Sequence, residues 1–289
     1  MPHAVTRPRK PFLSANDQLT VHQVPSADDN LIWLAVCNAT GATAAVDGPE
    51  AQSVLDHCER HGLRLTAILN THTHPDHIGI NRDFAKRHEL RHLRVVGSNM
   101  RADDIPGITE RVNDGDRFQL GDSVGEVWLT EGHLDGHISF LIDGVLFCGD
   151  TLFGGGCGRL FDGPPAKMHA SLQRFAALPN DTQVCCAHEY TQDNLRFAWM
   201  IDRDNEALRA RIQTVWNVRR IGGSTVPFTI GEELATNPFV RVTDPAIRWA
   251  VGEEFPEVDT ADPSAVLAAL RAWKNRGDHR AMPNDALPI

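Results

Sequence analysis

The densest group of reactive side chains lies at residues 72–77, which read HTHPDH. Three imidazoles and a carboxylate in so short a segment cannot all face an apolar core, because burying them without partners costs too much free energy. They must therefore face something that binds them. His72 and His74 lie two positions apart, so on an extended segment they project to the same side and can share one metal ion. Asp76 and His77 lie at the turn into a helical pattern and can serve a second ion.

Three further donors, His133, Asp150 and His188, each follow an apolar run later in the chain. A metal site of the zinc type needs about four ligands, and the 72–77 cluster alone leaves each ion short of them. A single His or Asp after a strand is more often a turn or cap residue than a ligand. Together with the cluster, however, the three donors predict one rim where all the ligands gather.

The elements that must position these donors are short apolar, β-branched runs bounded by turn residues, which predict strands. Helical patterns at residues 51–61, 78–87 and 166–178 lie between them. We therefore expect two sheets with helices outside, a four-layer αββα sandwich. The predicted strands are residues 19–24, 31–36, 42–46, 66–69, 93–96, 124–130, 138–142, 145–148 and 184–187.

The pattern changes near residue 191, after which helical stretches follow with almost no strand signal. These stretches cover residues 194–200, 205–219 and 263–274, and they predict a smaller helical domain. The opening of the chain is rich in Pro and Arg, which favours a flexible tail. The predicted organisation is a tail at 1–18, a metal-binding catalytic domain at 19–190 and a substrate-binding domain at 191–289.

Composition excludes several classes of protein. The formal net charge of -10 removes the general attraction to phosphate that supports nucleic-acid binding. No apolar run approaches the roughly 20 residues that cross a bilayer, and no apolar segment follows the N-terminus as in a secretory signal. Six cysteines without a CxxC pair suit reduced thiols. We expect a cytoplasmic monomer without nucleic-acid or membrane partners, whose 14 His against one Tyr direct attention to the histidine clusters.

The sequence resembles the metallo-β-lactamase superfamily, and within it glyoxalase II, the hydroxyacylglutathione hydrolases. The resemblance rests on HTHPDH, the later His133, and several segments from about Leu19 to the C-terminus. HTHPDH alone indicates only the superfamily, whereas the later segments are more specific. These segments are ADDN at 27–30, GDTLF at 149–153, GCGR at 156–159, HEYT at 188–191, TVP at 225–227 and NPFVR at 237–241.

The resemblance implies a binuclear centre with seven ligands, in which Asp150 bridges the two ions. Nitrogen and oxygen donors without cysteine suit two divalent ions, zinc first and iron or manganese as alternatives. Asp76 and Asp150 would be the catalytic carboxylates, and His137 would orient a ligand or pack as a structural residue. The other ligands would be His72, His74 and His133 for one ion, and Asp76, His77 and His188 for the second.

The implied reaction is hydrolysis of an S-2-hydroxyacylglutathione, such as S-lactoylglutathione, to a 2-hydroxy acid and glutathione, a step in methylglyoxal detoxification. A hydroxide bridging the metals would attack the thioester carbonyl while a metal stabilises the oxyanion. Because a free thiol ionises near pH ~8.5, the thiolate leaves without a dedicated general acid.

Glutathione carries two carboxylates and one ammonium, so this acidic protein must supply a local basic patch. The residues that match the contact positions of the family are Arg159, Tyr190 and Lys274, and Arg276, one position from a further contact position, is also a predicted substrate contact. Phe161 stands where many relatives have Tyr, and Gly277 stands where a Lys is usual. These two departures leave open whether glutathione is the thiol of the substrate.

Three other functions fit part of the pattern. A persulfide dioxygenase of the same fold uses one iron and has a similar GCGR segment, but such relatives end soon after the sandwich domain. A thioesterase or lactonase with another acyl substrate, and a non-enzymatic metal-storing module, are the others. The roughly 100 residues after Thr191 and the HEYT and NPF segments favour the hydrolase.

Overall fold

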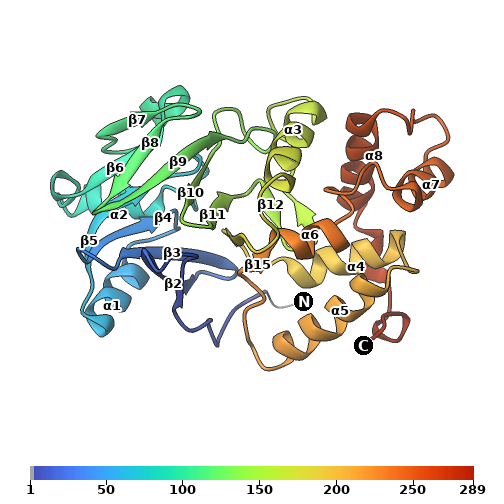
Figure 1. Ribbon diagram of the computed structural model, residues 1–289, viewed down its shortest axis with the longest axis horizontal. Helices are drawn as coiled ribbons and strands as arrows, with labels where there is room; N and C mark the ends of the chain where they lie inside the picture. The colour runs from blue at the N-terminus through green and yellow to red at the C-terminus, as the bar shows by residue number, and fades with distance from the viewer. Residues whose placement is uncertain (1–2) are drawn as a thin grey trace.

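The computed structural model describes residues 3–289. Its strands form two large sheets, with helices on the outer faces, and one two-stranded ribbon (Figure 1). This confirms the predicted αββα sandwich followed by a helical region. Side chains from both sheets meet in one large core, which includes Trp33, Phe118, Phe140 and Phe147. All four are at most 1% exposed. Burial of such large apolar side chains is the main driving force for packing the two sheets together.

The first sheet has seven strands in chain order and changes from antiparallel to parallel pairing after β4. Helices α1 (Gln52–His61) and α2 (Gly79–Lys86) cover its outer face and pack on a second apolar cluster. The strands are β1 (Phe12–Leu13), β2 (Leu19–Ser26), β3 (Asn30–Cys37), β4 (Ala42–Val46), β5 (Arg64–Leu69), β6 (Arg94–Ser98) and β7 (Glu110–Val112).

Strand β3 illustrates why this sequence builds a central layer. Every residue of β3 is buried, as expected for a strand covered on both faces. Leu31 and Trp33 point into the core between the sheets, whereas Ile32 and Leu34 point toward α1 and α2. The period of two along a strand thus divides one apolar run between two cores.

The second sheet has six strands in the order β15-β14-β11-β10-β9-β8. Helix α3 (Pro165–Ala176) covers it with Met168, Leu172 and Phe175, which lie on one face of the helix. A two-stranded ribbon of β12 (Leu152–Phe153) and β13 (Gly156–Cys157) follows the sheet's central strand. The six strands are β8 (Arg117–Leu120), β9 (Ser123–Leu129), β10 (Ile138–Ile142), β11 (Val145–Gly149), β14 (Gln183–Cys186) and β15 (Phe228–Thr229).

The C-terminal region is mainly helical, as predicted. Its helices α4 and α5 pack through a separate cluster that contains Leu195, Trp199, Leu208 and Ile212. The region also supplies β15, which pairs antiparallel with β14 and so extends the second sheet. Two residues are too short a run to give a strand pattern in the sequence. The helices are α4 (Thr191–Ile201), α5 (Glu206–Arg220), α6 (Ile230–Thr236), α7 (Pro245–Glu254) and α8 (Pro263–Arg276).

Short 3-10 turns complete the secondary structure at four places. Two of them flank β6 and two follow α8 near the C-terminus. They are η1 (Leu90–His92), η2 (Asn99–Asp104), η3 (Asp278–Ala281) and η4 (Asn284–Ala286).

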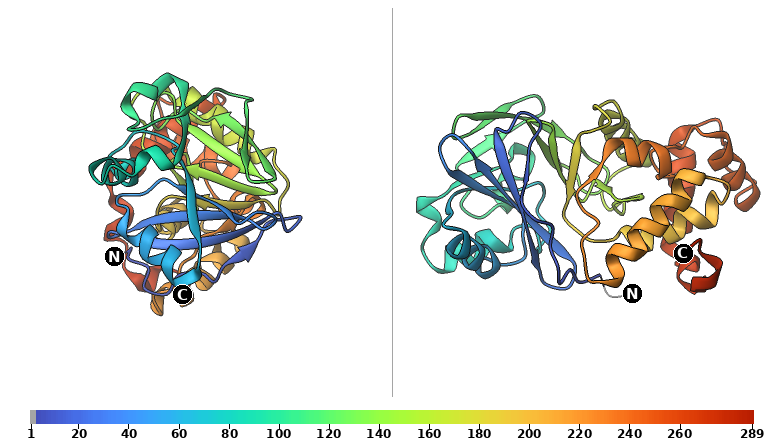
Figure 2. Two further views of the ribbon diagram at one scale, coloured as in Figure 1. Left: turned by 90° about the vertical axis from the view of Figure 1, so that its left-hand side faces the viewer. Right: turned by 60° about the horizontal axis from the view of Figure 1, so that its bottom comes forward.

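Residues 3–18 lie along the body of the protein, whereas the sequence predicts a flexible tail there. The backbone of Thr6 donates a 3.1 Å hydrogen bond to Gly222 just after α5, and Phe12–Leu13 forms β1. In Figure 2 the first described residues lie beside α5. Met1 and Pro2 of the predicted tail lie outside the described part of the chain. Backbone hydrogen bonding to a distant loop is a tertiary feature that composition does not reveal.

In residues 3–289, no helix is both long and apolar enough to span a bilayer. All six cysteines are buried and unpaired.

Candidate active site

The HTHPDH segment forms the turn between β5 and α2, at the carboxyl end of a parallel strand. Asp47 follows β4, the parallel neighbour, and therefore lies at the same edge of the sheet. Its carboxylate accepts hydrogen bonds from the backbone N–H of Thr71 at 2.8 Å and from the Thr71 hydroxyl at 2.6 Å. Asn70 donates to the His77 carbonyl at 3.1 Å. Buried polar contacts of this kind fix the shape of the turn before any ligand is present.

The second sheet supplies the remaining donors at the facing edge. Asp150 follows β11, and His188 follows β14, which runs parallel to β11. His133 lies in the turn after β9. The structure thus brings all seven predicted ligands together, and their donor atoms fall into two groups, each within 4.8 Å. The groups are His72, His74, His133 and Asp150, and Asp76, His77 and His188.

In the first group, Nε2 of His72 and Nε2 of His133 each lie 3.0 Å from Nδ1 of His74. The Asp150 Oδ2 atom lies 3.4 Å from His133 Nε2. Ligands of a tetrahedral zinc ion with bonds of about 2.0–2.1 Å stand about 3.3 Å apart, so these separations suit one shared ion.

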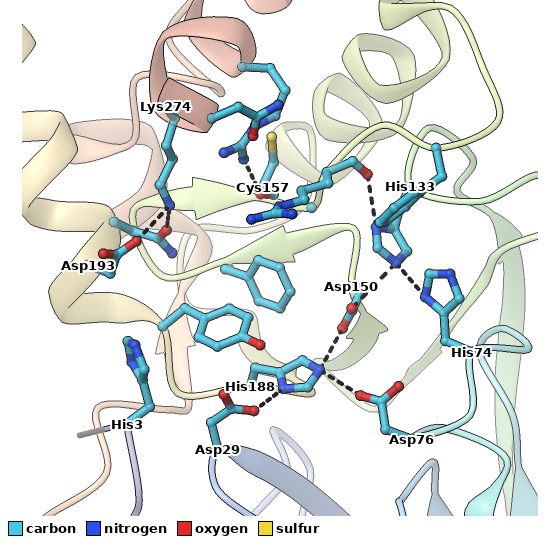
Figure 3. A pocket seen from close by; sticks show the side chains of 18 of the residues that line it. His3, Asp29, His74, Asp76, His133, Asp150, Cys157, His188, Asp193 and Lys274 are labelled. Atoms are coloured by element: carbon cyan, nitrogen blue, oxygen red, sulfur yellow. Dashed lines mark hydrogen bonds and ion pairs between the residues drawn. The ribbon is translucent and has the colours of Figure 1, made fainter. Parts of the chain in front are cut away.

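In the second group, His188 Nε2 lies 3.4 Å from Asp76 Oδ2, and His77 Nε2 lies 3.6 Å from the same oxygen. The other carboxylate oxygen of Asp150, Oδ1, lies 3.5 Å from His77 Nε2 and 3.4 Å from His188 Nε2. Asp150 therefore presents one oxygen to each group, as a bridging ligand must (Figure 3).

Two buried polar atoms test whether the site fits metal ions. His77 Nε2 and Asp150 Oδ1 are fully buried and have no hydrogen-bond partner. Leaving such atoms unsatisfied costs free energy. A cation shared by these two atoms and His188 Nε2 would give both a partner, so the residues of the second group fit a metal ion.

For three of the five imidazoles, the contact on the side away from the centre shows which nitrogen donates. A carboxylate or carbonyl oxygen can only accept, so the Nδ1 atom that contacts it must donate. This leaves the Nε2 lone pair facing the centre, which is the orientation a metal ligand needs. The pairs are His188 with Asp29 at 2.8 Å, His77 with Asp47 at 2.9 Å, and His133 with the Arg159 carbonyl at 2.9 Å.

His137 does not join either group of donors but holds its neighbours in position. Its ring stacks on His72 with 4.7 Å between centroids. Its Nε2 atom accepts the backbone N–H of Asp150 at 3.3 Å, and its Nδ1 atom lies 3.2 Å from the Thr130 hydroxyl. Burial lowers its pKa well below the ordinary value, so the ring is neutral. Through the backbone of Asp150, His137 helps to hold that residue in position. This agrees with the first of its two predicted roles, orienting a ligand.

Electrostatics in the centre are dominated by carboxylates. Burial disfavours the protonated form of His188, yet the charges of Asp150 and Asp29 raise its pKa to about 10. Burial also opposes ionisation of Asp76, but hydrogen bonding to His188 and the His77 charge hold its pKa well below the usual range. Bound cations would replace these protons, and their positive charge would favour the neutral form of the imidazoles.

Gly158 in the GCGR segment permits the chain to approach the centre closely. A Cβ atom there would lie 2.1 Å from the Asp150 carbonyl and 2.9 Å from His133 Nδ1. No side chain fits at such distances. The glycine is therefore required by the packing of this segment against two candidate ligands.

The centre opens into a cavity of about 390 Å³ between the sandwich and the C-terminal helices. Tyr190 stacks on His188 with ring centroids 4.8 Å apart, and His3 meets Tyr190 edge-on at 5.4 Å. Burial and the charge of Asp29 raise the pKa of Tyr190 above its usual value, so the phenol stays protonated. His3 belongs to the predicted tail, and its place in the cavity wall was not foreseen.

The wall of the cavity opposite the centre carries positive charge from α8 and η3, together with Arg159. Figure 3 shows Lys274 of α8 on this wall, beside Asp193. Lys274 is buried and contacts Asn194, and its Nζ atom lies 3.6 Å from Asp193. Burial, and next the charge of Arg271, lower the pKa of Lys274 to about 7. We call this group the basic wall: Arg159, Arg271, Lys274 and Arg280.

The structure does not bring Arg276 to the cavity, contrary to the prediction. Its guanidinium pairs with Glu254 and, at 3.0 Å, with Asp278. On a helix, residues three or four positions apart share a face, so Arg271 and Asn275 line the cavity with Lys274 while Arg276 points away. Helical periodicity in the sequence therefore contained the signal for Arg271.

The two departures from the family pattern have different surroundings. Phe161 is exposed and lies edge-on to His74 and His133, with centroids 5.3 and 5.2 Å away, at the cavity mouth. Gly277 ends α8 in the left-handed conformation, with φ of 82°. A glycine adopts this conformation without strain, so Gly277 terminates the helix that carries Lys274.

Residues 50–188 match the family model described as the metallo-beta-lactamase superfamily. Solved structures agree at the level of the fold. ETHE1 from Myxococcus xanthus aligns with a TM-score of 0.56 and 23% identity, covering 93% of this chain and 98% of its own. The BLEG-1 B3 metallo-beta-lactamase aligns with a TM-score of 0.57 and 21% identity, covering 76% and 99%. The fold and site together define a metallo-β-lactamase-type protein.

Residues 189–277 match the model described as the hydroxyacylglutathione hydrolase C-terminus. Relatives named hydroxyacylglutathione hydrolase extend over 89% of this chain. The Synechococcus sp. protein is 44% identical with all of its length covered, and the Methylococcus capsulatus protein is 45% identical with 98% covered. The chain therefore belongs to the hydroxyacylglutathione hydrolase family.

Proposed function

We infer that this protein hydrolyses S-2-hydroxyacylglutathione thioesters to a 2-hydroxy acid and glutathione with a binuclear metal centre. Its family membership supports the reaction. The observation that carries the inference is the bridging arrangement of Asp150, whose two carboxylate oxygens face two separate groups of imidazoles. The 2-hydroxy acid product is the kind formed in methylglyoxal detoxification.

The seven residues of the two groups would hold two divalent ions, for which we propose zinc, with iron or manganese as alternatives. When bound, such ions supply a hydroxide at neutral pH and stabilise negative charge on the carbonyl oxygen. The Asp76 carboxylate lies at the edge of the centre, where it can accept a hydrogen bond. It would orient the attacking oxygen. Asp29 and Asp47 keep the Nε2 atoms of His188 and His77 turned inward. No side chain has to protonate the leaving thiolate.

The basic wall supports glutathione as the thiol of the substrate. Glutathione brings two carboxylates and one ammonium, and the wall offers Arg159, Arg271 and Lys274 for the carboxylates. Asp193 lines the same cavity but pairs with Lys274 and Arg280, so the wall keeps a net positive charge. Tyr190 offers a protonated phenol beside the centre. A zwitterionic ligand thus suits this cavity better than a neutral lactone does.

Localisation and assembly are part of the same proposal. Six buried, unpaired cysteines suit a reducing compartment, which supports the cytoplasm. We propose that the protein works as a monomer.

A substrate panel tests this function. Purified, metal-loaded protein should hydrolyse S-lactoylglutathione with a kcat/KM at least about 100-fold above that for an acyl-coenzyme A thioester or a simple lactone, because only the first places two carboxylates and one ammonium close to the thioester, within reach of the wall. An equal or higher kcat/KM for either of the other two would overturn the glutathione assignment. Oxygen uptake with glutathione persulfide, without thioester hydrolysis, would instead identify a dioxygenase.

A further inference from the structure

A second cluster of imidazoles lies outside the catalytic cavity. It consists of His22 on β2 and of His57 and His61 on α1, whose donor nitrogens all lie within 4.8 Å of one another. None of the three lines the cavity that contains the metal centre. We call it the α1 histidine cluster.

Sequence spacing explains how the cluster forms. His57 and His61 are four positions apart on α1 and therefore share one helix face. On β2, Val21 points into the core between the sheets, so its neighbour His22 points to the outer face that α1 covers. Helix α1 lies beside β2 at the outer side of the first sheet (Figure 1).

The contacts within the cluster resemble those of the catalytic ligands. His22 Nδ1 lies 3.1 Å from His57 Nε2, close to the roughly 3.3 Å between two nitrogens that share a tetrahedral ion. The rings of His57 and His61 stack with 4.2 Å between centroids, and those of His22 and His61 lie 5.3 Å apart. Burial, and then the charge of His61, lower the pKa of His57 to about 4. Its imidazole is therefore neutral at pH ~7 and can offer a lone pair.

The surroundings decide which ion the cluster would accept. A surface cavity of about 380 Å³ beside the cluster is lined by Arg9, Lys10 and Arg60, with Asp56 as the only carboxylate among its lining residues. Hard cations such as Mg²⁺ and Ca²⁺ prefer several oxygen ligands, which this site does not offer. Borderline ions such as Zn²⁺ bind neutral imidazole nitrogen well.

We propose that the α1 histidine cluster is a third metal site of this protein, which binds Zn²⁺ through His22, His57 and His61. The cavity leaves room for water as the fourth ligand. One ring of the His22–His57 hydrogen bond now donates its N–H, so on binding that ring moves its proton to its other nitrogen and both lone pairs become available. The ion would join α1 to β2, because it binds side chains of both elements. Since these side chains meet only in the folded protein, binding would stabilise the folded state.

Metal content of the intact holoenzyme tests the proposal. After dialysis against micromolar free Zn²⁺ with Mg²⁺ in excess, the wild-type protein should hold one more zinc ion per chain than a His61→Gln variant. His61 is the exposed member of the cluster, so its replacement leaves the fold intact. A His92→Gln variant is the matched control, since His92 is also exposed and lies outside the cluster. It should keep the full zinc content.

A second pair of measurements separates this site from the catalytic centre. Added Zn²⁺ should raise the Tm of the metal-loaded wild-type protein by about 2–5 °C and leave that of His61→Gln unchanged. Asp150→Ala should lose metal at the centre yet retain the zinc ion of the α1 histidine cluster. Equal zinc content in wild type and His61→Gln, or an equal shift of Tm in both, would overturn the proposal.

Discussion

The metal centre and the basic wall face the same cavity but are built in different ways. The centre collects donors from strand ends of two sheets, and most of these donors are buried and held by a hydrogen bond on their far side. The wall draws most of its charge from one helix and the turn after it, and Asp193 partly neutralises that charge. The comparison indicates that the strand ends of the two sheets fix the positions of the reactive groups. Substrate preference depends instead on a few cationic side chains of the basic wall.

Removing the bridge of the metal centre should have the largest effect. Asp150→Ala deletes the one carboxylate that serves both groups, so we expect loss of both metal ions. We also expect a fall in kcat of at least about 10³-fold, because several kcal/mol of transition-state stabilisation is lost. Metal analysis and thioester hydrolysis measure the two effects.

An exposed carboxylate provides the control for that variant. Asp181→Ala removes a charge of the same kind from the surface and should leave metal content and kcat unchanged. If Asp150→Ala retained two metal ions, the bridging role would be wrong.

A smaller loss of metal affinity is expected when the hydrogen-bond partner of a candidate ligand is changed. Asp29→Asn keeps the size of the side chain but offers an amide to His188 Nδ1 in place of a carboxylate. We expect metal affinity to fall about 10–100-fold, as is usual when the partner of a ligating imidazole is changed. Competition with a chelator measures it. The neighbouring Asp28→Asn is exposed and should match wild type; equal affinity in both variants would contradict the role of Asp29.

Changes in the basic wall should act on binding rather than on chemistry. Lys274→Ala removes a cation that would contact a substrate carboxylate, so we expect KM for S-lactoylglutathione to rise about tenfold with kcat within about twofold. Steady-state kinetics test this, with Lys86→Ala as the control because Lys86 is exposed on α2, away from the cavity. An unchanged KM in Lys274→Ala would exclude Lys274 from the substrate site.

The dependence of kcat/KM on pH further separates the role of the basic wall from that of the metal centre. Since the pKa of Lys274 is lowered to about 7, its charge is fully present below that pH and is lost as the pH rises through it. The carboxylates of glutathione stay ionised throughout this range. In wild type, kcat/KM should therefore fall by up to about tenfold from about pH 6 to about pH 8, relative to the Lys274→Ala profile. Lys274→Arg, whose guanidinium keeps its charge, should not show this fall; parallel profiles in all three proteins would contradict the assignment.

The sequence predicted the centre better than the wall for a physical reason. Ligands such as His72 and His74 follow from spacing on one segment, and Asp150 and His188 follow apolar runs that end at a common edge. Asp47 has no such signal, because it reaches His77 only through the pairing of β4 with β5. The proximity of these donors could therefore be predicted where local spacing sufficed, and their hydrogen-bond partners could not.

Elsewhere the prediction failed where tertiary contacts decide the outcome. The family pattern predicts Arg276 at the substrate site, although the turn of α8 directs Arg271 to the cavity instead. The sandwich itself was predictable because long apolar runs alternate with amphipathic helices. The N-terminal segment and the short β15 were not, since each gains its structure from a partner far along the chain.

Activity as a function of bound metal tests the central claim most directly. The metal-free protein is titrated with Zn²⁺ while hydrolysis of S-lactoylglutathione and bound metal are measured together. We predict that activity depends on filling both groups of the centre and is complete when they hold two ions, with further zinc at the α1 histidine cluster adding none. Full thioester hydrolysis with a single ion at the centre, or no hydrolysis with both groups filled, would contradict the account.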